Sequence, residues 1–423
     1  MTENKSQVIK NDPWFGSYAS RAEGMRASEI RALFAVASRP EVVSLAGGMP
    51  YLDYLPFDEL SELVAKMLRE QGTKAWQYGS AQGDPHLRER ILDIIRLEHI
   101  TDAQADDVVI TNGSQSGLDL ITRIMCNPGD VIIAEDPNYV GALGVFRSFQ
   151  TEVVNAHMDA DGLIPQSFEE AIKTSIAQGK HVKFLYTVPN FHNPAGVTMS
   201  VERRPQILEI ARKYHVLVVE DNPYGLLSFE DKTYPALRSY DADNVVYLSS
   251  FSKIIAPGMR VAWMIAPPGI RQKLVLGNES AILCPPNMSQ MTISTYLDNF
   301  DWKQQIKEYR GMYKSRCDAM DDALHTYMPY CQWNKPRGGF YMWVKIPDGL
   351  DAKAMLPRAV TARVAYVSGT AFYDNGQGAD HMRLSFCYPT EDEIREGIRR
   401  LSTVVDDELS TAQLFGTTSI EKH

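Results

Sequence analysis

A lysine, an arginine and several hydroxyls stand together in one short stretch, residues 245–263. An apolar run, 245–248, leads into these side chains, with a Pro-Gly turn before the arginine: Ser249, Ser250, Ser252, Lys253 and Arg260. Hydroxyls and a guanidinium donate hydrogen bonds to an acceptor-only group such as phosphate. A lysine among apolar neighbours tends to lose its proton, and the neutral amine can attack a carbonyl carbon to form a Schiff base. Phosphate and aldehyde together suggest pyridoxal phosphate; the alternative is a surface loop with one solvated lysine.

The elements that must position these groups repeat along the chain. Seven apolar runs are mostly separated by helix-like segments: 108–111, 131–134, 153–156, 182–187, 216–220, 245–248 and 261–266. Such alternation predicts an α/β fold with a mostly parallel sheet covered by helices on both faces. Ligands of such sheets bind beyond the carboxyl ends of the strands. We therefore expect the chemistry in the residues that directly follow each run.

The first two of these strand ends carry an anion-site pattern and an aromatic ring. Ser114 and Gln115 lie in a glycine-containing turn that opens a helix over 118–125, and free N–H groups at a helix start attract anions. An ordinary helix with a capping residue at its start would show the same sequence pattern. Tyr139 follows the next run and could lie flat on a planar ring, or could be a core tyrosine.

The next two strand ends carry an amide and a carboxylate. Two prolines and a glycine fix the backbone around Asn193, which would aim its side chain inward as a donor. Asp221 ends a buried strand and needs a cationic partner, which a protonated pyridine nitrogen would supply. A metal site at Glu220 and Asp221 is the rival interpretation, but no histidine or further carboxylate group completes a ligand set. We predict no metal.

The carboxyl-terminal third predicts a second, smaller α+β unit. A long helix over 301–327 precedes strands at 338–346, 364–367 and 382–386 and a closing helix near 391–407. Near the other end, helical spacing covers 27–38, a short strand with a glycine turn covers 42–50, and an amphipathic helix covers 57–71. We expect these parts: an arm at 1–24, a small domain from 25–55 and 301–410, a large domain at 56–300 and a tail at 411–423.

Composition excludes several classes of protein. The 423 residues include 43 basic and 53 acidic side chains, and the net charge of −10 argues against a nucleic-acid surface. The polar start lacks the apolar core of a signal peptide, and no apolar run approaches the roughly 20 residues that span a bilayer. Five scattered cysteines show no metal-ligand spacing. We expect a reduced, cytoplasmic protein.

The order of these residues resembles the fold-type I pyridoxal-phosphate aminotransferases of class I/II, and within them the branch of 2-aminoadipate and kynurenine aminotransferases. The resemblance spans about residues 27–407. Its most specific pieces are Asn193-Pro194-Ala195-Gly196, Asp221-Asn222-Pro223-Tyr224, Ser250-Phe251-Ser252-Lys253 with Arg260, and Arg383-Leu384-Ser385-Phe386. The family more often has threonine where Ala195 and Ile254 stand, which affects the fine shape of the pocket and leaves the reaction class intact.

The resemblance implies a role for each residue around the cofactor ring. Lys253 would form the internal aldimine and later carry the proton between the substrate Cα and the cofactor C4′. Asp221 would pair with the pyridine nitrogen, Asn193 and Tyr224 would bond the phenolic oxygen, and Tyr139 would stack on the ring.

It also implies the groups that hold the phosphate and the substrate. The phosphate would be held by Ser114, Gln115, Ser250, Ser252 and Arg260. Tyr78 would reach the phosphate of a neighbouring subunit, which implies a homodimer. Arg383 would grip the substrate α-carboxylate, close to Gly48 and Asn193, because a bidentate pair fixes Cα relative to the lysine. Arg31 would recognise an acidic side chain, or would form an exposed helical salt bridge.

Three functions remain open from the sequence. The first is transfer of an amino group between an L-amino acid (aromatic, aliphatic or 2-aminoadipate-like) and a 2-oxo acid such as 2-oxoglutarate. The second keeps the cofactor but performs β-elimination, racemisation or decarboxylation, which Arg383 and the resemblance disfavour. The third is the effector domain of a transcription factor, but only about 25 polar residues precede the fold, too few for a helix-turn-helix domain.

Overall fold

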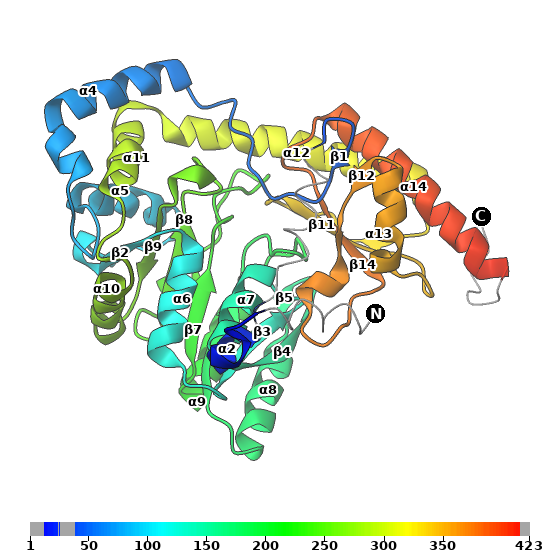
Figure 1. The fold of residues 1–423 in the computed structure, drawn as a ribbon, viewed down its shortest axis with the longest axis horizontal. Coiled ribbons are helices and arrows are strands. Elements are labelled where there is room, and N and C mark those ends of the chain that lie inside the picture. Colours follow the sequence, from blue (N-terminus) through cyan, green and yellow to red (C-terminus); the bar gives the residue numbers. More distant parts are fainter. Residues whose placement is uncertain (1–11, 24, 26–38, 415–423) are drawn as a thin grey trace.

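The structure is a computed structural model that describes residues 12–23, 25 and 39–414. The helix expected at 27–38, and Arg31 with it, lies outside the described residues. Two layered units lie side by side, and the long helix α12 (Trp302–Tyr327) runs along the top of the view from the larger to the smaller (Figure 1). The expected α/β architecture with a second, smaller α+β unit is confirmed.

The large unit is built on an eight-stranded sheet of order β2-β9-β8-β7-β6-β3-β4-β5. All seven predicted runs are strands: β2 Val108–Thr111, β3 Val131–Asp136, β4 Glu152–Asp159, β6 Val182–Thr187, β7 Leu217–Asp221, β8 Val245–Ser250 and β9 Ala262–Ile265, joined by the short β5 Gly162–Leu163. Strand β9 is antiparallel to both β2 and β8. Its amino end therefore lies beside the carboxyl ends of its neighbours, which brings Arg260 to the same edge.

Helices cover both faces of this sheet (Figure 1). One face packs against α6 (Ser114–Met125), α7 (Val140–Ser148) and α10 (Pro268–Ile282), through alternate strand residues such as Ile132 and Phe184. The opposite face packs against α8 (Pro165–Ala177) and α9 (Arg203–Tyr214) through the intervening residues. Because both faces are buried, the strands read as continuous apolar runs rather than as an alternation.

The smaller unit contains a four-stranded antiparallel sheet and a two-stranded parallel pair. The sheet order is β10-β11-β14-β13, with β10 Gln332–Trp333, β11 Tyr341–Lys345, β13 Val367–Ser368 and β14 His381–Ser385. The pair joins β1 (Val43–Ser44) to β12 (Val364–Ala365), so the run predicted at 364–367 divides between two sheets. Helices α13 (Ala352–Thr361) and α14 (Glu391–Leu414) complete the unit, and α14 continues beyond the expected residue 407.

A helical group at the outer end of the large unit is longer than predicted. Helix α4 (Phe57–Trp76) continues past residue 71, where Gln71 has non-helical dihedral angles. It packs on α11 (Asn287–Asn299), and α5 (Pro85–Ile95) packs beside both sheet and α11. Short helical pieces fill the connections: η1 Phe15–Ser17, α2 Ser20–Glu23, η2 Arg96–Glu98, η3 Ala105–Asp107, η4 Leu237–Ser239, η5 Pro257–Met259 and η6 Gly369–Phe372. Within the described ranges, no helix has the length and apolarity to cross a membrane.

Candidate active site

A cavity of about 680 Å³ opens at the carboxyl edge of the large sheet, where the smaller unit meets it. Twelve of the predicted site residues line it: Gly48, Ser114, Gln115, Tyr139, Asn193, Asp221, Tyr224, Ser250, Ser252, Lys253, Arg260 and Arg383. The structure therefore brings together residues that are more than 300 positions apart in the chain. Most of them end or follow strands of the large sheet at this edge, whereas Gly48 and Arg383 come from the smaller unit.

Lys253 lies half-buried in the cavity wall, directly after β8. Its Nζ donates a hydrogen bond to the carbonyl oxygen of Gly48 at 2.9 Å and lies 5.7 Å from the centre of the Phe340 ring. Burial lowers the pKa of this amine to about 8, with a further lowering from Arg383 and Arg260. About a tenth of the amine is thus uncharged at pH 7 and about half at pH 8, and the uncharged form is the one that attacks a carbonyl.

Asp221 supplies a buried carboxylate with one unused oxygen. Only 3% of the residue is exposed, and its Oδ2 accepts a hydrogen bond from the Tyr186 hydroxyl at 2.8 Å. Its Oδ1 is buried and has no hydrogen-bond partner. Burial raises the pKa of Asp221 to about 7. A cation placed against Oδ1 would both satisfy this atom and restore the ionised form.

The neighbouring Glu220 takes no part in this cavity. Successive residues of a strand point to opposite faces, and both Glu220 oxygens accept backbone N–H groups, from Leu237 and Arg238, each at 3.0 Å. Glu220 and Asp221 therefore cannot share a metal ion, which removes the rival interpretation. No group of three or more metal-ligating side chains occurs in the part of the chain that the structure describes.

One end of the cavity has the features of an anion site. Helix α6 begins at Ser114, and the preceding Gly113 has φ of 80°, where a Cβ would overlap the guanidinium of Arg260. Ser250 Oγ donates to Ser252 Oγ at 2.8 Å beside it. A helix start, a guanidinium and two hydroxyls suit a phosphate. Gln115 lines the same end, with its amide donating to the carbonyl oxygen of Gly141 at 2.8 Å.

Arg383 lies at the other end of the cavity and is 2% exposed. Its Nη1 donates to Asn193 Oδ1 at 2.8 Å and its Nη2 donates to the Ala46 carbonyl oxygen at 2.7 Å. Its Nε has no partner, and among the described residues no carboxylate forms an ion pair with it. A buried guanidinium without an anion is arranged to receive one from a ligand.

Aromatic side chains occupy the space between these two ends. The Tyr224 hydroxyl lies 3.4 Å from that of Tyr341, and a Cβ on Gly48 would overlap the Tyr341 hydroxyl. Only a glycine therefore allows this approach. Tyr139 precedes α7 and lies against Gly141, on the cavity wall.

Tyr186 and Tyr341 line the cavity although the sequence did not single them out. Tyr186 is the penultimate residue of the apolar strand β6, and its hydroxyl is the polar group that could have identified it. Tyr341 lies on β11, two residues before the position that pairs with Arg383 on β14. The Arg383 guanidinium lies 4.2 Å from the centre of the Tyr341 ring. The remaining lining residues not predicted are Met49, Pro50, Val140, Gly141, Val188, Pro223 and Pro257.

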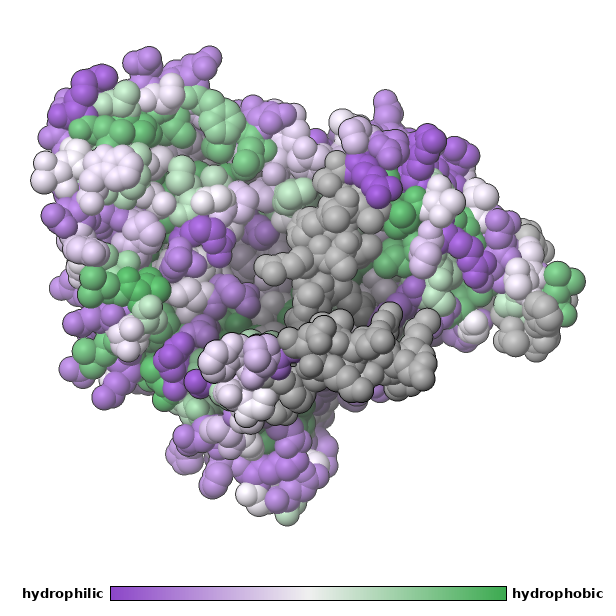
Figure 2. Space-filling view, viewed as in Figure 1, coloured by the Kyte–Doolittle hydropathy of each residue, from purple (hydrophilic) through white to green (hydrophobic). Residues whose placement is uncertain are grey.

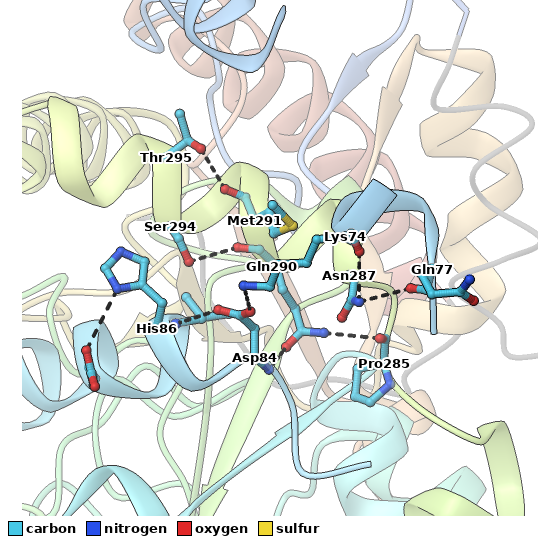
Figure 3. Close-up of polar contacts among 12 residues, drawn as sticks. Lys74, Gln77, Asp84, His86, Pro285, Asn287, Gln290, Met291, Ser294 and Thr295 are labelled. Carbon is cyan, nitrogen blue, oxygen red and sulfur yellow. Dashed lines mark hydrogen bonds and ion pairs between the residues drawn. The ribbon is translucent and has the colours of Figure 1, made fainter. Parts of the chain in front are cut away.

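Tyr78 lies outside the cavity and is 75% exposed. Figure 3 shows how the turn that carries it is held: the Asn287 amide donates to the carbonyl oxygens of Lys74 and Gln77, at 3.2 and 3.0 Å. In the same view Gln290 Oε1 accepts from the backbone N–H of Asp84 at 2.7 Å. The backbone around Tyr78 is thus fixed while its side chain faces outward.

The cavity fits pyridoxal phosphate in the chemistry of its donors and acceptors. An anion site lies at one end of the cavity, and the Lys253 amine, whose pKa is lowered, lies in its wall. The buried Asp221 Oδ1 has no hydrogen-bond partner and can accept from a cation. The Arg383 guanidinium, which has no carboxylate partner among the described residues, completes the set on the substrate side. These are the four groups that a phosphate, an aldehyde, a pyridinium and an amino-acid carboxylate require.

Comparison with known proteins agrees with this geometry. A family model described as aminotransferase class I and II matches residues 41–401. An aromatic-amino-acid aminotransferase of Thermococcus litoralis is 39% identical, with 93% of this chain and 94% of that protein aligned.

Two solved structures have the same fold at high coverage. A kynurenine aminotransferase of Pyrococcus horikoshii, in complex with PMP, is 40% identical with a TM-score of 0.88 and covers 93% of this chain and 97% of its own. An alpha-aminoadipate aminotransferase of Thermus thermophilus, complexed with N-(5'-phosphopyridoxyl)-L-leucine, is 31% identical with a TM-score of 0.87, at 95% and 100% coverage. These names support transamination and give no support to the lyase alternative.

Proposed function

The chain belongs to the class I and II aminotransferases and uses pyridoxal phosphate, and we propose that its cavity transfers the amino group of an aromatic or long apolar L-amino acid to a 2-oxo acid such as 2-oxoglutarate. One observation carries this proposal. The Lys253 amine, the unpartnered oxygen of Asp221 and the unpaired guanidinium of Arg383 face a single cavity.

Pyridoxal phosphate, when bound, supplies an aldehyde that takes up the amino group and a ring that accepts electrons from the substrate Cα. Lys253 would bond the aldehyde carbon before the amino acid arrives, and its released amine would then carry the proton between the substrate Cα and the cofactor C4′. Asp221 would pair through Oδ1 with the ring nitrogen, while Tyr186 holds the other oxygen of Asp221 at 2.8 Å. Lys253 must leave the carbonyl oxygen of Gly48, its partner in this structure, to do this work.

The remaining cavity residues orient the ring and its phosphate. Asn193 has its amide nitrogen available for the phenolic oxygen, since its Oδ1 already accepts from Arg383, and the Tyr224 hydroxyl serves the same oxygen. Tyr139, in the cavity wall, would stack on the ring. The phosphate is held at the start of α6 and beside it, by Ser114, Gln115, Ser250, Ser252 and Arg260.

Arg383 binds the substrate α-carboxylate, with Gly48 and Asn193 beside it. The described lining contains aromatic and apolar side chains near this end, among them Tyr341, Met49 and Val188, and its cations are Lys253, Arg260 and Arg383. Since each of these cations has a role, the described wall favours an uncharged substrate side chain. A 2-aminoadipate-like side chain, or the second carboxylate of 2-oxoglutarate, would use Arg31, which lies outside the described residues.

Two copies of the chain form the active enzyme in this proposal, and Tyr78 of each copy reaches the phosphate in the other. Large apolar side chains are exposed on α4, on α10 and beside them: Phe57, Trp76, Tyr78, Leu276, Ile282 and Leu283. Figure 2 shows apolar surface on the left of the molecule, where α4 and α10 lie in Figure 1. A second copy would bury this surface. Light scattering of the holoenzyme should give the mass of two chains, and a monomer of full activity would contradict the assembly.

We also propose the domain bounds and the compartment expected from the sequence. The large domain is 56–300, and the small domain combines 25–55 with 301–410, a division supported by the pairing of β1 with β12. A cytoplasmic location is supported by the five cysteines, all of which are free thiols.

The direct test is a half-reaction followed by the absorbance of the bound cofactor. Adding an aromatic amino acid alone should abolish the band of the lysine-bound cofactor, and adding 2-oxoglutarate afterwards should restore it. Alanine and 2-aminoadipate, tested in the same way, rank the substrate side chains. If no amino acid changed the spectrum, or if the purified protein took up no pyridoxal phosphate, the proposed function would be wrong.

A further inference from the structure

The carboxyl edge of the sheet has a second polar layer, on the face opposite the cavity. Thr187, Glu220 and Tyr247 are direct neighbours across β6, β7 and β8, and Asp221 pairs with Leu248 one position further on. Since side chains alternate along a strand, these three residues point away from the cavity that Asp221 faces. None of them lines the cavity.

A chain of four buried side chains runs through this layer. Glu98, which ends η2 beyond α5, accepts a hydrogen bond from Asn222 Nδ2 at 2.7 Å on one oxygen and from the Tyr247 hydroxyl on the other. Asn222 Oδ1 accepts from Asn190 Nδ2 at 3.0 Å, and Asn190 Oδ1 accepts from Arg204 Nη2 at 2.7 Å. The four members, here called the Glu98 chain, are at most 2% exposed: Glu98, Asn222, Asn190 and Arg204.

The Glu98 chain connects the two loops that carry cofactor-facing groups. Asn222 directly follows Asp221, and Asn190 lies three residues before Asn193. The Asn222–Asn190 hydrogen bond therefore fixes one loop relative to the other, and Glu98 and Arg204 fix the two ends of the chain to η2 and α9. The backbone of Asn222 is held as well, with its carbonyl oxygen accepting from Ser249 Oγ at 2.9 Å.

We propose that Glu98 is a positioning residue for the reaction: acting through Asn222 and Asn190, it sets the distance between Asp221 and Asn193 on the ring. The Arg204 guanidinium can only donate, so it commits both amides in direction and leaves Asn222 Nδ2 to donate to a Glu98 oxygen. Burial raises the pKa of Glu98 to about 8, and its carboxyl group keeps an accepting oxygen for Asn222 in either protonation state. With the donor fixed at one end, the chain has one hydrogen-bond pattern. It therefore holds the two loops in one arrangement before the cofactor binds. The inference rests on the proposed roles of Asp221 and Asn193.

The experiment compares Glu98→Ala with Glu98→Gln in the purified holoenzyme. Glu98→Ala removes the group to which Asn222 Nδ2 and the Tyr247 hydroxyl are hydrogen-bonded. We therefore expect Glu98→Ala to lower kcat about tenfold and to raise the dissociation constant of pyridoxal phosphate about tenfold. The KM for the amino acid should stay within about threefold of wild type. The pH midpoint of the cofactor absorbance should also move. Glu98→Gln keeps an acceptor for Asn222 and an amide for Tyr247, and should restore all three values to within about threefold.

Glu220→Gln is the matched control, because Glu220 is a fully buried carboxylate on the same face that contacts no member of the chain through a side-chain hydrogen bond. It should lower thermal stability and leave kcat and the dissociation constant of pyridoxal phosphate within about threefold of wild type. If Glu98→Ala altered only stability, as this control does, or if Glu98→Gln lost as much kcat as Glu98→Ala, the positioning role would be wrong. A wild-type protein that binds no pyridoxal phosphate would instead refute the proposed function.

Asn222→Ala gives a second route should Glu98→Ala fail to fold. It removes the middle link and should reproduce the same loss of kcat and cofactor affinity. In the double variant Glu98→Ala/Asn222→Ala, the loss should not exceed that of Asn222→Ala alone, because both changes interrupt one chain. Additive losses would contradict a shared pathway through Asn222.

Discussion

The two faces of the large sheet use buried carboxylates at the same edge in opposite ways. On the cavity face, Asp221 has one oxygen without a hydrogen-bond partner. On the opposite face, both oxygens are hydrogen-bonded in each of three buried glutamates: Glu98, Glu135 and Glu220.

This difference separates a binding site from a structural layer. A buried polar atom without a partner costs about 1–3 kcal/mol, so folding alone would not favour leaving the Asp221 oxygen without a hydrogen bond. The cavity face accepts this cost because a ligand removes it. The opposite face needs no ligand, and its satisfied carboxylates fix the strand ends that carry the cavity residues.

The largest effect should come from Lys253→Ala. Without the amine no group in the wall can move the proton from Cα, and we expect kcat to fall by about 10⁴-fold or more, with loss of the absorbance of the lysine-bound cofactor. Single-turnover absorbance changes measure this. Lys307→Ala, on the exposed side of α12, is the control and should behave as wild type. Full turnover in Lys253→Ala would show that another group does the chemistry.

Asp221→Asn and Glu220→Gln compare the two faces directly. Each substitution replaces a carboxylate by an amide of the same shape. In the proposed function Asp221 pairs with the ring nitrogen, so its replacement should lower kcat by about 10²–10⁴-fold. Glu220→Gln should leave kcat within about threefold and reduce stability by about 1–3 kcal/mol. Steady-state kinetics and thermal unfolding give both values. Equal effects of the two substitutions on kcat would contradict the assignment of Asp221 to the binding site and of Glu220 to the structural layer.

Arg383→Lys tests the substrate end of the cavity. A lysine keeps the charge but loses the planar fork that binds a carboxylate with two hydrogen bonds and stacks on Tyr341. We expect KM for the amino acid and for the oxo acid to rise together by about 10–100-fold, with little change in the affinity for pyridoxal phosphate. A variant that weakened cofactor binding instead would place Arg383 in the wrong part of the site.

The smallest effect concerns pH. Burial lowers the pKa of Lys253 to about 8, and only the neutral amine reacts with an aldehyde. The rate at which apoenzyme captures pyridoxal phosphate should therefore rise by about tenfold from pH 7 to 9, with its midpoint near pH 8, and level off above about pH 9. Stopped-flow absorbance measures this rate. An amine with an ordinary pKa would give a rate that keeps rising toward pH 10.

Much of the cavity could be predicted because strand ends in a parallel sheet meet at one edge. Polar residues directly after apolar runs, such as Asn193, Asp221 and Lys253, needed only the order of the strands to be placed together. Arg260 precedes its strand and still joins them, because β9 runs antiparallel. Tyr186 and Tyr341 were missed because each lies inside an apolar strand, where the sequence does not show which face meets the cavity.

The sequence by itself determined the chemistry of the site: which groups donate, accept or react, and their order along the chain. Tertiary structure alone decided which of those groups remain unsatisfied. Glu98 meets Asn222 across 124 positions, and Tyr186 takes one oxygen of Asp221 while the other stays free. The physical reason is that hydrogen bonds depend on distances of about 3 Å between side chains that only the packed sheet brings together.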